Sequence, residues 1–257
     1  MVAGVRARVL LTAPHGGNQL RDGVVKAADQ YTAALALLLA ELTGAAALVC
    51  IGGPYPDPAW PAPAGAEGPA LEVAQQFSSA TLGRKVVLDL HGMRNDHGPD
   101  ICLGLGASPS RRELLLAGRL VRLGKRLGLS VTVNSPFRGD RATSVTSLAQ
   151  LSGVTALQIE IARRLRDPRQ DPARVGTLVA FLCGTVRLSA QLQQVAHARH
   201  SGEQCGEPEI RPKTCRTGVN ITFPGRESSR KRKVQGSKRA STASSQSFGV
   251  YSGPEGL

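Results

Sequence analysis

Short apolar runs, separated by longer stretches with helical spacing, constrain the fold of this 257-residue chain most strongly. A strand buried on both faces is typically such a continuous run, and helices between successive strands favour parallel pairing. The sequence therefore predicts an α/β fold with a mixed, largely parallel sheet flanked by helices on both faces. Runs rich in Val, Ile and Leu occupy residues 7–13, 46–51, 85–90, 100–105, 131–133 and 155–161.

Three of the stretches outside these runs are predicted to be helices. Within 110–127, leucines recur at helical spacing, Ser110 and Glu113 have the spacing of a capping box, and Gly128 provides a C-terminal stop. A second apolar stripe predicts a helix over about 24–43. The last helix is expected to begin at Asp171, with Pro172 in its first turn.

Two other stretches have no such pattern. Residues 52–68, GGPYPDPAWPAPAGAEG, are too rich in proline and glycine for a regular element, so a long loop is expected there. From about residue 199 the chain becomes polar and basic, and it lacks the apolar surface that would offset the entropy of ordering. We therefore expect a folded domain at 1–198 and a disordered, low-complexity tail at 199–257.

The net charge of +13 does not by itself indicate a nucleic-acid-binding protein, because it is spread over the domain and the tail. The run RKRK at 230–233 leaves open an alternative in which the tail binds nucleic acid or another polyanion. Solvated charge is the commoner explanation of such a run, so we expect a nucleic-acid partner to be absent. The oligomeric state cannot be inferred.

Cysteine usage and hydropathy favour a cytoplasmic protein without a membrane partner. The five cysteines are odd in number and scattered, which argues against a disulfide framework. The longest apolar stretches, such as residues 33–40, are shorter than the roughly 20 residues of a membrane span. Residues 1–8 lead straight into a strand-like run rather than a signal peptide.

Candidate functional side chains lie at or near the ends of three apolar runs. His15 follows the first run, His91 closes VVLDLH, and Glu160 lies in TALQIEI. Ligands of open α/β sheets bind at the carboxyl ends of the strands, so these three side chains are candidates for one site. Each also has a structural explanation: a lone histidine is often only hydrogen-bonded, and Glu160 could pair with Arg163 or Arg164.

Five segments together resemble the N-formylglutamate amidohydrolase family in order and spacing. They cover roughly residues 7–165 and read APHGG at 13–17, DLHG at 89–92, HGPDICLGLG at 97–106, VNSPFRG at 133–139 and GVTALQIEI at 153–161. The resemblance implies a zinc-carboxypeptidase-like α/β fold, one zinc ion, and hydrolysis of the amide bond of an N-acyl amino acid such as N-formylglutamate.

The resemblance also implies a set of metal ligands. His15 and His91 fall on the two histidine ligands. Related enzymes place an acid three residues after the first histidine, but this chain has Asn18 there, so Asp29 is the predicted third ligand and Asp22 the alternative. Two imidazoles and one carboxylate leave a coordination position open for water. Asp89, two residues before His91, could hold that imidazole by its other nitrogen.

Glu160 is the predicted catalytic base, which takes a proton from the attacking water and passes it to the departing amine. Arg138 is predicted to assist catalysis and to bind a substrate carboxylate, together with Asn134, Arg94 and His97. The family usually carries an asparagine where this chain has Ala59. A catalytically degenerate family member is therefore an alternative to the small-molecule hydrolase.

Overall fold

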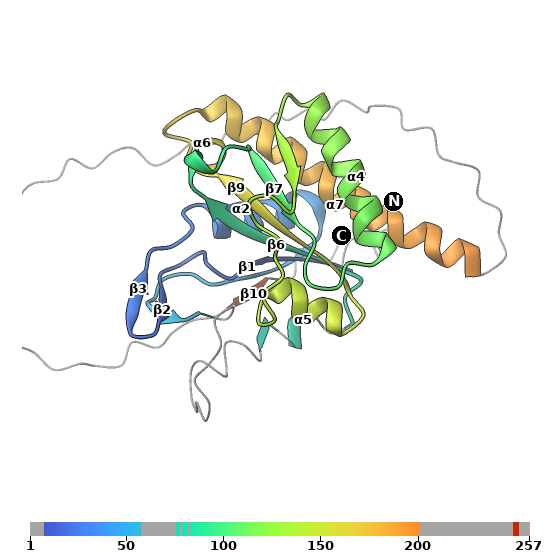
Figure 1. Ribbon diagram of the computed structural model, residues 1–257, viewed down its shortest axis with the longest axis horizontal. Coiled ribbons are helices and arrows are strands. Elements are labelled where there is room, and N and C mark those ends of the chain that lie inside the picture. The colour runs from blue at the N-terminus through green and yellow to red at the C-terminus, as the bar shows by residue number, and fades with distance from the viewer. Residues whose placement is uncertain (1–7, 58–75, 78, 82, 201–248, 252–257) are drawn as a thin grey trace, which may run out of the picture.

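A seven-stranded sheet forms the centre of this computed structural model, which describes residues 8–57, 76–77, 79–81, 83–200 and 249–251 (Figure 1). The strand order is β10-β4-β1-β6-β9-β7-β8. The strands are β1 Val9–Ala13, β4 Ala46–Val49, β6 Val86–Met93, β7 Ile101–Gly104, β8 Val131–Val133, β9 Thr155–Ala162 and β10 Gly249–Tyr251.

The sheet is mixed but largely parallel, as predicted. β4, β1, β6 and β9 pair in parallel, and so do β7 and β8, whereas β7 runs antiparallel to β9. In the β6–β9 register His91 lies opposite Glu160, so two of the candidate residues come from neighbouring strands. The carboxyl ends of β1, β6 and β9 lie side by side, which brings the ends of three predicted strands to one edge.

Helices cover both faces of the sheet, which confirms the predicted fold class. One face, with Leu11, Leu88 and Leu157, shares a core with the three long helices α2 Thr32–Thr43, α4 Arg111–Arg126 and α7 Pro172–His200. The opposite face packs against α5 Val145–Leu151. Because successive strand residues point to opposite faces, the central strands β1, β4, β6 and β9 contribute to both cores. Two further short helices are η1 Asn95–His97 and α6 Arg163–Arg166.

Two of the three predicted helices begin close to their predicted positions. α4 starts after Ser110, whose capping box with Glu113 is formed, and α7 starts at Pro172. The third prediction is wrong at its N-terminal end, because α2 begins only at Thr32. The residues before it form a hairpin of β2 Gln19–Arg21 and β3 Val24–Lys26. The Asp-Gly pair between these strands has positive φ at both positions, as a tight hairpin turn requires.

The proline-rich stretch at 52–68 is also not wholly irregular, contrary to the prediction. Tyr55–Pro56 form β5, which pairs in parallel with β2 and completes a second, three-stranded sheet. The Tyr55 hydroxyl donates to the Pro14 carbonyl, and this contact joins the strand to the segment beside His15. Proline is tolerated at such an edge, where its missing N–H is not needed. Ala59 lies outside the described residues.

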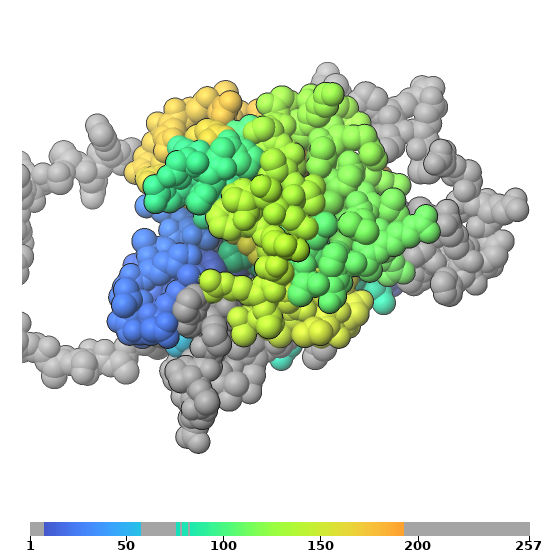
Figure 2. Space-filling view, viewed as in Figure 1, coloured from blue at the N-terminus to red at the C-terminus, as the bar shows by residue number. Residues whose placement is uncertain are grey.

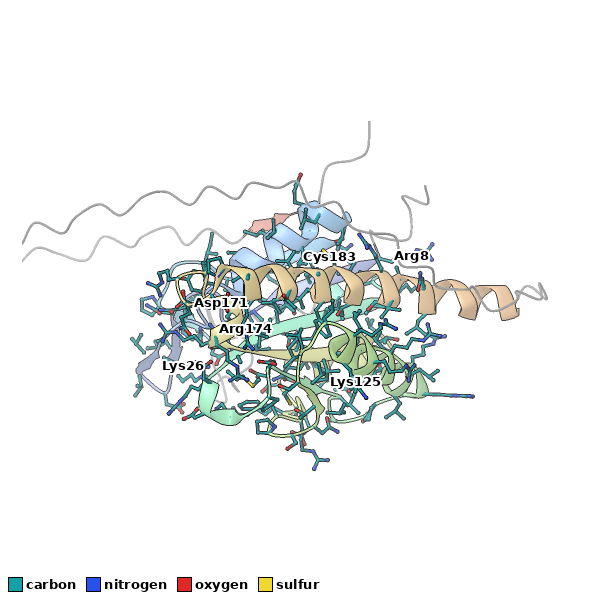
Figure 3. All side chains as sticks on the ribbon, turned by 90° about the horizontal axis from the view of Figure 1, so that it is seen from above. Arg8, Lys26, Lys125, Asp171, Arg174 and Cys183 are labelled. Carbon is teal, nitrogen blue, oxygen red and sulfur yellow. The ribbon has the colours of Figure 1, made fainter. Side chains whose placement is uncertain are left out.

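Helix α7 is long and apolar enough, over Pro172–Leu192, to cross a membrane by length and composition. The sequence analysis predicted this helix but did not count it as a possible membrane span, because polar residues interrupt its apolar runs. Leu178, Phe181, Leu182 and Val186 are buried in the core shared with α2 and α4. Figure 3 shows α7 lying between these two helices, with Cys183 near its middle. This packing is that of a core helix.

The predicted tail lies mostly outside the described residues, and so do the RKRK run and the last two cysteines. Its described part departs from the prediction of disorder at both of its ends, because α7 extends to His200 and a strand forms at 249–251. Residues Gly249–Tyr251 form β10, antiparallel to β4 at the edge of the central sheet. The domain boundary after residue 198 remains a prediction.

A buried carboxylate network beside η1 gives the fold an expected pH dependence. Asp100 accepts hydrogen bonds from the Ser130 N–H and hydroxyl, and it pairs with Arg164 at 2.9 Å and Arg174 at 3.4 Å. Burial by itself would raise the pKa of Asp100, but the bonds from Ser130 and Arg164 lower it. A carboxylate whose pKa is lower in the folded state stabilises the protein above its unfolded pKa. That contribution is lost as the pH falls through the folded pKa.

We therefore expect Asp100→Asn to lower the free energy of unfolding by about 1.5–3 kcal/mol at pH 7. The difference from wild type should shrink as the pH falls below about 4, because the unfolded wild-type chain then binds a proton that the folded Asp100 carboxylate does not. Urea unfolding at several pH values measures both quantities. A difference that stays constant down to pH 3 would contradict this account of Asp100.

Candidate metal and catalytic site

Three buried side chains bring one donor atom each to a common point. His15 Nδ1 and His91 Nδ1 are 3.0 Å apart, and Asp29 Oδ2 lies 3.4 Å from the first and 3.7 Å from the second. These residues form the group in the described part of the chain that could hold a metal ion. The residues predicted as ligands are thus brought together, whereas Asp22 is exposed in the β2–β3 turn.

Backbone contacts place the three side chains. His91 lies within β6, and His15 lies two residues after the end of β1. The His15 carbonyl accepts from the Asp29 N–H at 2.7 Å, and the Gly92 N–H donates to Asp29 Oδ2 at 3.0 Å. Asn18, at the position where the family has an acid, accepts from the Ala28 N–H and so holds the segment that carries Asp29.

Each histidine is fixed through its second nitrogen by a different carboxylate. His15 Nε2 lies 2.9 Å from Asp57 Oδ1, and His91 Nε2 lies 3.0 Å from Asp89 Oδ2. An ionised carboxylate only accepts hydrogen bonds, so each Nε2 must carry the proton. Both Nδ1 atoms then present lone pairs to each other. Such an arrangement needs a cation or a shared proton between the rings.

The spacing of the three donor atoms fits a zinc ion. Tetrahedral zinc with nitrogen and oxygen ligands at about 2.0–2.2 Å separates its donors by roughly 3.3 Å. The observed separations of 3.0, 3.4 and 3.7 Å lie around that value. Carboxylates that bind the far nitrogen of a metal-binding histidine are also the usual outer partners of such sites. The donor set therefore fits the group that the resemblance implies.

The electrostatics of the cluster also favour a cation. Burial by itself would raise the pKa of Asp29, but hydrogen bonds with His15 and His91 hold it well below its usual range. Burial by itself would lower the pKa of His91, but the charge of Asp89 raises it above the ordinary value. The surroundings thus keep Asp29 ionised and attract positive charge to the imidazoles.

Glu160 lies beside this cluster and is buried. The alternative ion pairs are not formed in the described structure, because Arg163 pairs with Asp167 and Arg164 with Asp100. Instead the Gln158 side chain donates to Glu160 Oε1 at 2.6 Å. Burial raises the pKa of Glu160, and the nearby charge of His91 opposes this rise. A carboxyl group in such a position is suited to hold and release a proton.

The four predicted substrate-binding residues lie farther out. Arg138 is largely exposed and pairs with Asp140, and Arg94 pairs with Asp96. Asn134 uses its side-chain oxygen to accept from the Leu105 N–H, and His97 stacks edge-on against the Phe137 ring. None of the four makes a hydrogen bond or ion pair to the histidine cluster within the described structure. Their role in substrate binding remains a prediction.

The surface is hollowed between the β2–β3 hairpin and the loop that follows β8 (Figure 2). Both borders of this hollow adjoin the cluster. Lys26, at the end of β3, has its ammonium nitrogen 3.9 Å from Asp29 Oδ1. On the other side, Gly139 lies against Gln158, since a Cβ on this glycine would be 2.9 Å from the Gln158 amide oxygen. The loop that carries Arg138 therefore reaches the neighbourhood of Glu160.

Sequence reasoning missed Asp57 and Arg166. Asp57 follows β5 and is fully buried, where Arg21 Nε also donates to it. The one sequence signal for a functional role of Asp57 is its position in a long proline-rich loop, since such loops often carry functional residues. Arg166 ends α6 and is buried against Gly92. Its sequence context, among several surface arginines, gives no sign of burial.

The fold of the chain is similar to that of a solved amidohydrolase structure. The chain shares its fold with the crystal structure of an N-formylglutamate amidohydrolase from Ralstonia eutropha JMP134, at 18% identity and a TM-score of 0.52, covering 74% of this chain and 95% of that chain. A bacteriophage poly-gamma-glutamate hydrolase is more distant, with 15% identity, coverage of 76% and 84%, and a TM-score of 0.42. None of the curated proteins compared matches the chain.

A protein-family model matches part of the chain. The family model described as N-formylglutamate amidohydrolase matches residues 70–166, a region that includes Asp89, His91 and Glu160. This match, with the shared fold, supports an amide hydrolase. The predicted resemblance to the N-formylglutamate amidohydrolase family is thereby confirmed.

Proposed function

We propose that the chain is a zinc-dependent amidohydrolase that cleaves the amide bond of an N-acyl amino acid such as N-formylglutamate. The observation that carries this proposal is the convergence of His15 Nδ1, His91 Nδ1 and Asp29 Oδ2 beside Glu160. The family match over residues 70–166 supports amide hydrolysis, and the donor set supports zinc.

His15, Asp29 and His91 would hold one zinc ion. When bound there, zinc supplies a Lewis acid that lowers the pKa of water and stabilises negative charge on an acyl oxygen. Asp57 and Asp89 keep the two imidazoles in the tautomer that leaves Nδ1 free to bind the metal. The hydroxyl of Thr12 donates to Asp89 Oδ1 at 2.6 Å and so fixes that carboxylate in turn.

Glu160 would move the protons of the reaction. Its carboxylate accepts a proton as water attacks the acyl carbon, and the same proton goes to the amine when the C–N bond breaks. Water and the N-acyl amino acid are thereby converted into a carboxylic acid and a free amino acid. Because the Gln158 amide holds Oε1, the other oxygen of Glu160 is the one available for proton transfer.

Substrate recognition would involve the borders of the hollow. An N-acyl amino acid carries at least one carboxylate, and cationic donors bind such groups. Arg138, Asn134, Arg94 and His97 are the proposed binding residues, and Arg138 lies in the loop that approaches Gln158 through Gly139. A cytoplasmic location fits the three described cysteines, which are free and buried.

The proposal is tested by assaying the purified full-length chain for zinc and for hydrolysis. We expect about one zinc per chain and release of free amino acid from a panel of N-formyl and N-acetyl amino acids. Removal of the metal with a chelator should abolish the activity, and added zinc should restore it. Stoichiometric zinc without turnover of any substrate in the panel would support the degenerate alternative and contradict the proposed reaction.

A further inference from the structure

Arg166 makes an unusual set of contacts for a buried arginine. Its side chain is almost fully enclosed, and its hydrogen bonds go to three backbone carbonyls. Nε donates to Ile161 at the end of β9, Nη2 to Met93 at the end of β6, and Nη1 to Gln30 at 2.6 Å. No carboxylate pairs with this guanidinium in the described part of the chain.

These three carbonyls belong to the segments that carry the candidate site. Ile161 follows Glu160, Met93 follows His91 by two residues, and Gln30 follows Asp29. Asp29 lies in an irregular segment, whereas the other two residues lie in paired strands of the sheet. The bond to Gln30 therefore ties the irregular segment that carries Asp29 to the two paired strands β6 and β9.

Gly92 connects this guanidinium directly with Asp29. A Cβ on Gly92 would lie 2.5 Å from Arg166 Nη2, so the guanidinium occupies the space that any side chain at position 92 would need. The N–H of the same glycine donates to Asp29 Oδ2, the oxygen that faces both histidines. Gly92 thus leaves room for the Arg166 guanidinium because it has no side chain, and its backbone N–H holds the Asp29 carboxylate.

We infer that Arg166 is a positioning residue for the metal site, which holds the Asp29 segment against the ends of β6 and β9 so that Asp29 Oδ2 meets the two imidazoles. This inference rests on the proposed function, because it assumes that the three donors bind a metal. A guanidinium suits the task since its planar fork presents several donors in fixed directions. Lysine, with one point of attachment, could not bind all three carbonyls in the same geometry.

The test compares Arg166→Met with Arg164→Met in the full-length chain. Arg164 is a matched control on the same short helix, because it also binds two backbone carbonyls, those of Asn95 and Gly98, but it contacts Asp100 rather than the candidate site. Zinc affinity is measured by competition with a chromophoric chelator. The visible spectrum of the Co²⁺-substituted protein reports the ligand geometry independently of activity.

We expect Arg166→Met to weaken zinc binding by about 10- to 100-fold and to change the Co²⁺ spectrum. Arg164→Met should keep the wild-type affinity and spectrum, although its thermal stability falls. Millimolar guanidinium ion should restore part of the affinity of an Arg166→Ala variant and have no such effect on wild type. Wild-type affinity and spectrum in Arg166→Met would overturn the inference.

Gly92→Ala provides a second variant should Arg166→Met not fold. It keeps the N–H that binds Asp29 but displaces the guanidinium, and it should weaken zinc binding in the same direction with a smaller factor. Unchanged zinc affinity in Gly92→Ala would count against a role for the guanidinium. A wild-type chain that binds no zinc would instead refute the proposed function, which distinguishes the two failures.

Discussion

Glu160→Gln is expected to lower kcat by about 10²- to 10⁴-fold while zinc remains bound. The amide is nearly the same size as the carboxyl group, so packing in the β6–β9 pair should be kept. It cannot accept the proton of the attacking water, however, and the departing amine then lacks its proton donor. Steady-state hydrolysis of the best N-acyl amino acid, with zinc content determined on the same sample, measures the effect.

Glu113→Gln is the matched control for this substitution. Glu113 is also a buried glutamate, but it caps α4 and accepts from the Ala156 N–H near the start of β9, whereas Glu160 lies near the carboxyl end of that strand. The amide has one oxygen where the carboxylate uses two, so Glu113→Gln loses one of these bonds and should lower the stability of the fold. Because the substitution is remote from the histidines, kcat of the folded protein should stay close to wild type. If Glu160→Gln retains more than about a tenth of the wild-type kcat, the loss is smaller than removal of a general base causes, and Glu160 is not the base.

His91→Ala is expected to abolish zinc binding at micromolar metal. The substitution removes one of three donors, and it also leaves the buried Asp89 carboxylate without its imidazole partner. The loss of affinity should exceed the 10- to 100-fold that removal of an outer partner causes. Zinc content after dialysis against a defined zinc buffer gives the measurement.

His97→Ala serves as the histidine control for that measurement, since His97 is exposed and stacks on Phe137 rather than facing the cluster. Its zinc content should equal that of wild type. Equal zinc content in His91→Ala and wild type would mean that the metal, if present, is held elsewhere.

Much of the fold was predictable because its signals are local. The bounds of each predicted apolar run agree with those of a strand to within a few residues. A strand buried on both faces needs an almost continuous run of apolar residues, and such a run is visible in the sequence. The capping box at Ser110 and the proline at 172 are also local signals, and they predicted the starts of two helices. The hairpin before α2 was missed although Asp22-Gly23 is a turn signal, because the following apolar residues also fit a helical stripe.

The candidate site was only partly predictable. Residues placed by the local strand pattern could be predicted, whereas residues placed by contacts with distant parts of the sequence could not. Asp89 and His91 are two residues apart and share one face of β6, and Gln158 and Glu160 share one face of β9 in the same way. The placement of these side chains therefore follows from strand geometry. Asp29 required the family resemblance, because nothing in its own segment indicates burial. Asp57 and Arg166 act through contacts with residues 42 and 136 positions away, His15 and Gln30, which no local pattern encodes.

The position of the metal tests the account most directly. Crystals of the zinc-loaded protein, measured on both sides of the zinc absorption edge, should give one anomalous peak bonded to His15 Nδ1, His91 Nδ1 and Asp29 at about 2.0–2.2 Å. An anomalous peak elsewhere, or a zinc-loaded crystal in which these three donors contact no metal, would contradict the site on which the proposed chemistry depends.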